Sequence, residues 1–153
     1  MRLGTAALLA AALAGVVALA GCGGSDSTTS TTSETLTKSE FVAKANAICA
    51  KGNQEIRAAG EKLFSSGQAP SSAAQEKFVT ATVIPSIQQQ VDAIDDLPAP
   101  AGDEQKVQAI VNAAGSALDK VKQDPSLITA QGQSDPFAQA DKLTNSYGLT
   151  QCG

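Results

Sequence analysis

Apolar residues recur every three or four positions over much of the chain after residue 36. The longest such stripe follows a capping box, in which Thr37 and Glu40 can each accept a hydrogen bond from the other's backbone amide. Gly67 and Pro70 end the stripe, because both residues are poor helix formers. The spacing predicts a long first helix, on which Gly52 favours a close helix approach. Its expected inward positions are Phe41, Ala45, Ile48, Gly52, Ile56, Ala59 and Leu63.

A second apolar stripe begins at Ser72, which has Gln75 three residues later, and ends before the stiff segment Leu97-Pro98-Ala99-Pro100. Pro85 interrupts it, because proline lacks the N–H that would bond to the carbonyl of Ala81. The sequence leaves two outcomes open, one kinked helix or two shorter helices. The expected buried positions are Phe78, Val83 or Ile84, Ile87, Val91, Ile94 and Leu97.

Two further helices are predicted in the last third of the chain. Asp103 is the expected cap of the third helix, which stops at Asp124-Pro125. Asp135-Pro136 opens a short fourth helix, and Gly148 is its expected left-handed terminus. No stretch alternates between apolar and polar residues as a strand does. The predicted fold class is therefore all-α: a small antiparallel helical bundle of three long helices plus a short C-terminal helix.

The first 35 residues follow a different pattern. Arg2 precedes an apolar run that ends at Leu19-Ala20-Gly21, directly before Cys22, which is the layout of a secretory signal. A tract of Gly, Ser and Thr then continues to Thr35. Such a tract cannot bury enough apolar surface to offset its ordering entropy, so we expect a flexible tether.

Leu19-Ala20-Gly21-Cys22 resembles the lipobox of bacterial lipoproteins. The resemblance implies that Cys22 receives a diacylglyceryl group and becomes the new N-terminus, and two acyl chains hold a protein stably on a bilayer. The alternatives are a plain cleaved signal and a transmembrane helix, which the short run and the missing basic flank disfavour. We therefore expect attachment to the extracytoplasmic face of the cell membrane. The expected division is a lipoprotein signal peptide at 1–21, the lipidated cysteine and tether at 22–35, and a helical domain at 36–153.

Lipidation of Cys22 would leave Cys49 and Cys152 as an even pair in an exported protein, which predicts a disulfide. Helix lengths in an up-and-down bundle place both cysteines at a similar height. On the chain-entropy model, closing so long a loop stabilises the fold by about 4.7 kcal/mol. A redox-active or metal-binding pair is the alternative, but the two residues lack a CxxC spacing and the chain has no histidine.

Both ends of the predicted domain carry a second resemblance. The segment FVAKANAIC, residues 41–49, follows the Ser/Thr tether, and residues 135–153 read DPFAQADKLTNSYGLTQCG. Together they are similar to small, uncharacterised lipoproteins of actinobacteria, in which a segment ending in Ala-x-Ala-Ile-Cys accompanies a C-terminal Tyr-Gly-Leu-x-x-Cys. The resemblance implies a helical envelope domain closed by a disulfide. It implies no known activity and no catalytic residues.

Charge and residue types narrow the function further. The formal net charge is −4, and no basic patch is visible, so nucleic acid is not an expected partner. The absence of histidine excludes Ser-His-Asp and Cys-His catalysis. We expect no enzymatic activity, cofactor or metal. Hydrolysis of envelope polymers by carboxylates is the alternative, although Asp92, Asp95 and Asp96 are more simply explained as a solvated helix face.

The expected function is a binding or interaction module of the cell envelope. Its expected partners are membrane lipid, through the acylated Cys22, and an unknown envelope protein or ligand. A carrier of a small apolar ligand is a further alternative, although it requires an enclosed apolar cavity, for which an alanine-rich bundle of this size leaves little room. Phe137 and Tyr147 are the candidate ligand-binding residues, and they could equally anchor the short helix by packing.

Overall fold

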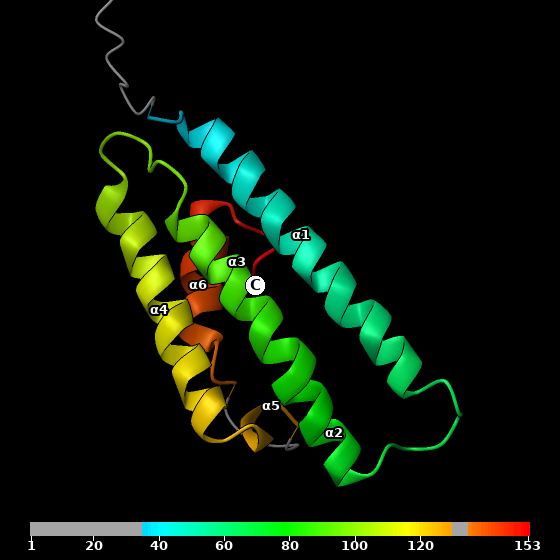
Figure 1. Cartoon of the computed structure of the whole chain (residues 1–153). Helices are drawn as coiled ribbons and strands as arrows, with labels where there is room; N and C mark the ends of the chain where they lie inside the picture. Colours follow the sequence, from blue (N-terminus) through cyan, green and yellow to red (C-terminus); the bar gives the residue numbers. More distant parts are fainter. Residues whose placement is uncertain (1–34, 130–134) are drawn as a thin grey trace, which may run out of the picture. The chain divides into compact units, whose positions relative to one another are not determined.

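The computed structural model describes residues 35–129 and 135–153, so Cys22, the predicted signal peptide and nearly all of the predicted tether lie outside the described residues. The described residues are helical and contain no strand, which confirms the predicted all-α class. Successive long helices run in alternate directions (Figure 1). The elements are α1 (Lys38–Leu63), α2 (Ser72–Phe78), the π-helical η1 (Val79–Val83), α3 (Ile84–Asp95), α4 (Glu104–Gln123), α5 (Ser126–Thr129) and α6 (Ala138–Tyr147).

The predicted capping box is present at the start of α1. The Thr37 amide donates to Glu40 Oε2 at 2.9 Å, and the Glu40 amide donates to Thr37 Oγ1 at 3.3 Å. The hydrogen bonds from Thr37 hold the pKa of Glu40 below its ordinary value. The helix ends at Leu63, four residues before Gly67. Its fully buried positions are Phe41, Ala45, Cys49 and Gly52.

Gly52 is where α1 and α3 approach each other closely. A Cβ atom at this position would overlap the end of the Gln90 side chain, which would have to move to make room for it. Ser86 Oγ donates to the Gly52 carbonyl at 3.4 Å, so a side chain of α3 also meets the backbone of α1 here. The close approach predicted at Gly52 is therefore confirmed.

Pro85 neither splits the second predicted helix into two separate helices nor lies in an uninterrupted α-helix. The helical backbone continues from α2 through η1 into α3, with Pro85 in the first turn of α3. In η1 the hydrogen bonding widens, and the Ile84 amide donates to the carbonyl of Val79, five residues back. A π turn leaves room for a residue that cannot donate to the carbonyl four positions earlier, so the chain accommodates Pro85 without a break.

Two predicted helix starts are confirmed in position. α2 begins at Ser72, and the capping side chain is that of the preceding Ser71, whose Oγ accepts from the Ala74 amide at 3.3 Å. Asp103 is the N-cap residue of α4, but its side chain makes no capping hydrogen bond. Its carboxylate instead accepts hydrogen bonds from Lys106 Nζ and from the Tyr147 hydroxyl.

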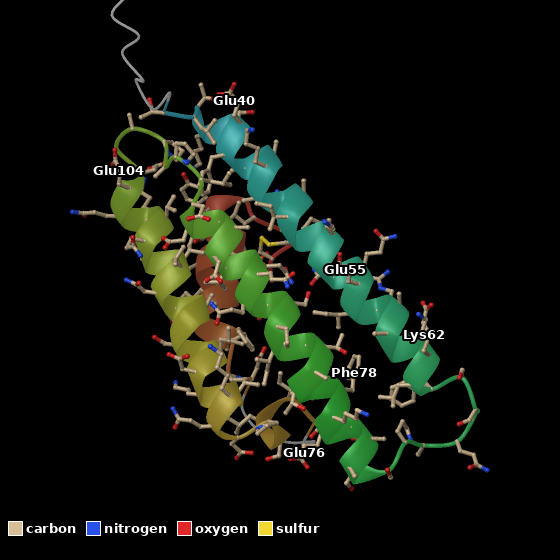
Figure 2. All side chains as sticks on the ribbon, viewed as in Figure 1. Glu40, Glu55, Lys62, Glu76, Phe78 and Glu104 are labelled. Carbon is tan, nitrogen blue, oxygen red and sulfur yellow. A yellow bond between two sulfur atoms is a disulfide. The ribbon has the colours of Figure 1, made fainter. Side chains whose placement is uncertain are left out.

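The end of α6 packs deeply against the start of α1. Gly148 ends α6 with a φ of 106°, as predicted, and turns the chain so that Leu149 is completely buried. The Phe41 and Tyr147 rings meet edge to face, with centroids 6.0 Å apart. The predicted Cys49–Cys152 disulfide is present, with the Cα atoms 5.1 Å apart (Figure 2). It ties the C-terminal segment to the middle of α1.

Candidate functional site

A cavity of about 320 Å³ lies between α1, α3, α4 and the start of α6. Its volume is at the lower end of the range typical of small-molecule sites, and its walls are mainly aliphatic, as such sites usually are. The cavity is half open to solvent, so it is not the enclosed cavity for which little room was expected. The main apolar side chains of the walls are Ile56, Ile87, Val91, Ile110, Val111 and Phe137.

Small residues explain why this space is left unfilled. Ala114 of α4, Ala140 of α6 and Gly153 all line the cavity, where larger side chains would occupy its volume. Helices that meet through alanine leave less side-chain volume between them than helices that meet through leucine. Small residues on α4, on α6 and at the C-terminus therefore leave this space open between the helices.

The disulfide forms one wall of the cavity. Cys49 is only 2% exposed, and both of its neighbours in this wall, Cys152 and Gly153, belong to the C-terminal segment. Asn46 holds this segment by donating to the Gly148 carbonyl at 3.1 Å and accepting from the Gln151 amide at 3.0 Å. This wall is consequently fixed to α1 by both covalent and hydrogen bonds.

Two carboxylates, Asp135 and Asp141, also line the cavity, and we call them the acidic rim. Asp135 Oδ1 accepts from the Phe137 amide at 2.8 Å, which fixes the chain at the start of α6. The only two ion pairs among the described residues, Lys106–Asp103 and Lys122–Asp119, involve neither member of the rim. No basic side chain lines the cavity. The rim therefore presents uncompensated negative charge beside an apolar space.

Desolvation raises the pKa of Asp141 above its ordinary value, and the nearby charge of Asp135 adds to the effect. This is the behaviour expected of two like charges held beside an apolar surface. It indicates that the rim lacks a positive partner.

A shallow apolar groove of about 360 Å³ continues from the cavity toward α5. The two spaces share Ile87, Asp135 and Phe137. The groove adds Leu127 and Ile128 of α5, and Ile128 is 37% exposed. A ligand longer than the cavity therefore has an apolar surface on which to extend.

The two aromatic residues singled out in the sequence occupy different places. Phe137 lines the cavity, whereas Tyr147 is 6% exposed and packs against Phe41 in the core. The Tyr147 hydroxyl donates to Asp103 Oδ2 at 3.0 Å, and Lys38 Nζ lies 4.5 Å from its ring centroid. Desolvation, followed by the bond to Asp103, raises the pKa of Tyr147 to about 12. A ligand role for either aromatic stays a prediction.

The carboxylates considered for hydrolysis do not belong to the cavity. Asp92, Asp95 and Asp96 are exposed at the end of α3, and Asp92 accepts a hydrogen bond from Gln88. Within the described residues no three Cys, Asp or Glu side chains are grouped as metal ligands would be. The acidic rim escaped the sequence analysis because Asp135 was interpreted only as a helix cap, and Asp141 carries no local signal of its position.

The predicted disulfide is part of the site, while Cys22 lies outside the described residues. No helix in residues 35–129 and 135–153 has both the length and the apolar character needed to cross a bilayer. Comparison with known proteins gave no match to a protein-family model, to a curated protein or to a solved structure.

Proposed function

We propose that this chain is a membrane-anchored binding protein of the cell envelope, which takes a small and mainly apolar molecule into the cavity. The observation that carries the proposal is the aliphatic lining of a space large enough for a small ligand. We take three long antiparallel helices and a short C-terminal helix as the scaffold that encloses it.

The proposed location of the protein at the membrane rests on the lipobox-like segment before Cys22. The Cys49–Cys152 disulfide supports export, because such bonds persist mainly in oxidising compartments. Mass spectrometry of the protein purified from its native membrane tests the anchor. We expect an N-terminal peptide that begins at a diacylglyceryl-modified Cys22. An unmodified N-terminus would contradict this part of the proposal.

Binding fits the site better than hydrolysis of a polymer does. Glycosidases place their two carboxyl groups at least about 5 Å apart to accommodate the reacting sugar, and bind polar substrates. Asp135 and Asp141 instead lie on a lining that is mostly aliphatic, which offers a sugar few hydrogen-bond partners. These features favour retention of an apolar body over chemistry on a sugar.

Calorimetry with a rigid, neutral and apolar probe tests the cavity. We would titrate 1-adamantanol into the processed protein in phosphatidylcholine nanodiscs and subtract the signal of empty nanodiscs. Ala114→Phe should abolish binding, because it fills space that Ala114 lines. Ala109→Phe is the matched control, since Ala109 is an exposed alanine of the same helix outside the cavity. Equal binding by both variants, or none by the unmodified protein, would refute the proposal.

A further inference from the structure

The acidic rim, Asp135 and Asp141, is the part of the cavity lining that binding of a purely apolar ligand does not account for. Asp135 is exposed and Asp141 is half-buried, and both line the same space as Phe137. A purely apolar ligand would cover the rim and remove water from the carboxylates without giving them a partner. Burying an unpaired charge is costly, so such a ligand would bind against an electrostatic penalty.

No group of this chain offsets that charge within the described residues. The polar side chains that line the cavity besides the rim are Asn53, Gln90 and Thr144, all of them uncharged. Each already donates a hydrogen bond to a backbone carbonyl, and Thr144 Oγ1 donates to the carbonyl of Asp141 at 3.0 Å. Among the described residues the rim therefore has no positive partner, which leaves a place for a positive charge carried by the ligand.

We propose that the ligand is a small amphiphilic amine, whose apolar body fills the cavity between Ile87 and Ile110 and whose ammonium group lies between the carboxylates of Asp135 and Asp141. This inference rests on the proposed function and names the ligand class for the same site. A charge-assisted hydrogen bond from an ammonium group is stronger than a neutral one, and a partly desolvated site strengthens it further.

A bare metal ion fits the rim less well than an organic cation does. Calcium takes six to eight oxygen ligands, whereas the rim offers two carboxylates, one of which also accepts from the Phe137 amide. The aliphatic walls beside the rim would contribute nothing to a hydrated ion, but they would bury an organic substituent. The combination of apolar walls and acidic rim therefore selects an amine with an apolar body.

Three probes with the same apolar body and different polar groups separate the contribution of the polar group to binding from that of the body. We would titrate 1-adamantanamine, 1-adamantanol and 1-adamantanecarboxylate into the processed protein in phosphatidylcholine nanodiscs, with empty nanodiscs as the blank. The amine should bind about tenfold more tightly than the alcohol, because a charge-assisted hydrogen bond contributes more to the binding free energy than a neutral one does. The carboxylate should bind more weakly than both, since the rim repels it.

Substitutions of single carboxylates show which residues cause the preference for the amine over the alcohol. Asp141→Asn and Asp135→Asn should each reduce the preference for the amine over the alcohol severalfold, while alcohol binding persists. Asp95→Asn removes an exposed carboxylate of α3 outside the cavity and should leave the preference unchanged. This control excludes a general effect of the negative net charge.

The outcomes distinguish the two proposals. If the alcohol binds and the amine binds no more tightly, the amine inference is wrong and the apolar binding function stands. If none of the three probes binds, the proposed function fails and the inference fails with it. If the preference for the amine survives both rim substitutions, the cation lies elsewhere and the inference is overturned.

Discussion

The two ends of the helical domain differ in how firmly they are held. At the closed end, formed by Phe41, Ala45, Tyr147 and Leu149, every one of these side chains is at most 6% exposed. At the open end, formed by Phe64, α2 and α5, Phe64 is 57% exposed and neither short helix contains a buried residue. The cavity lies between the two ends, with the disulfide in its wall and its groove running toward α5.

This difference shows how a small domain can be stable and still keep a cavity. The disulfide and the hydrogen bonds of Asn46 tie the closed end, where the C-terminal segment returns to α1. At the open end, Val79 and Val121 are buried, but α2 and α5 themselves contain no buried residue, and local opening is easiest where buried contacts are few. We expect ligand entry to involve the open end, and substitutions should affect the two ends unequally.

Removal of the disulfide should have the largest effect. A Cys49→Ser, Cys152→Ser double variant should lose about 4–5 kcal/mol of unfolding free energy, because the cross-link closes a loop with a sequence separation of 103 residues. Urea titration followed by circular dichroism measures this loss. A loss below about 1 kcal/mol would show that the hydrogen bonds of Asn46 hold the closed end without the cross-link.

One pair of phenylalanines compares the ends directly. Phe41→Ala should cost about 3–5 kcal/mol, because Phe41 is completely buried and contacts Tyr147. Phe64→Ala should change stability by less than about 1 kcal/mol, because more than half of Phe64 is already in solvent. Thermal and urea unfolding of both variants check the contrast. Similar losses would mean that the open end is packed in solution by something other than the described residues.

Substitution of two glycines inside helices should change the free energy of unfolding by smaller amounts and in opposite directions. Gly115→Ala should stabilise α4 by about 1 kcal/mol, because nothing lies within 4 Å of the added methyl group. Gly52→Ala should destabilise by about 1–2 kcal/mol, because it displaces Gln90 and breaks the hydrogen bonds of its amide to Ser86.

A double variant identifies the cause of the Gly52 effect. In a Gln90→Ala background the obstruction is gone, so Gly52→Ala should become neutral or stabilising through helix propensity. Urea unfolding of the single and double variants gives the coupling energy. If Gly52→Ala costs the same in both backgrounds, a contact other than Gln90 limits the approach of α1 and α3.

The sequence predicted the features that depend on local signals. The capping box at Thr37, the left-handed Gly148 and the all-α class each follow from residues a few positions apart. The disulfide was also predicted, on the expectation that lipidation of Cys22 leaves Cys49 and Cys152 as the one remaining pair in an exported protein. These features need no knowledge of how the helices pack.

The remaining features depend on residues that only packing brings together. Tyr147 and Asp103 are 44 residues apart, and their hydrogen bond engages the carboxylate of Asp103, which makes no capping bond at the start of α4. The cavity depends on the summed volumes of side chains from several helices, which hydrophobic spacing does not reveal. Asp141 looks like an ordinary acid on the short helix until the fold places it beside Asp135.

The smallest expected effect is a difference in how Asp103 at the closed end and Asp141 at the acidic rim contribute to stability as the pH changes. Hydrogen bonds from Lys106 and then Tyr147 lower the pKa of Asp103, so its contribution is present above the unfolded pKa of about 3.9 and is lost as the pH falls through the folded pKa. Desolvation raises the pKa of Asp141, so its contribution has the opposite sign: it is complete below the unfolded pKa and is lost as the pH rises through the folded pKa.

At pH 7, Asp103→Asn should therefore be less stable than the unmodified protein, and Asp141→Asn slightly more stable. Both differences should shrink as the pH falls toward 3, because protonation makes each carboxyl resemble the amide that replaces it. Urea unfolding at several pH values measures the two curves. If Asp141→Asn destabilises the protein at pH 7, then Asp141 makes a favourable charged contact in the free protein. The acidic rim would then already have a partner, which would contradict the binding of a ligand cation there.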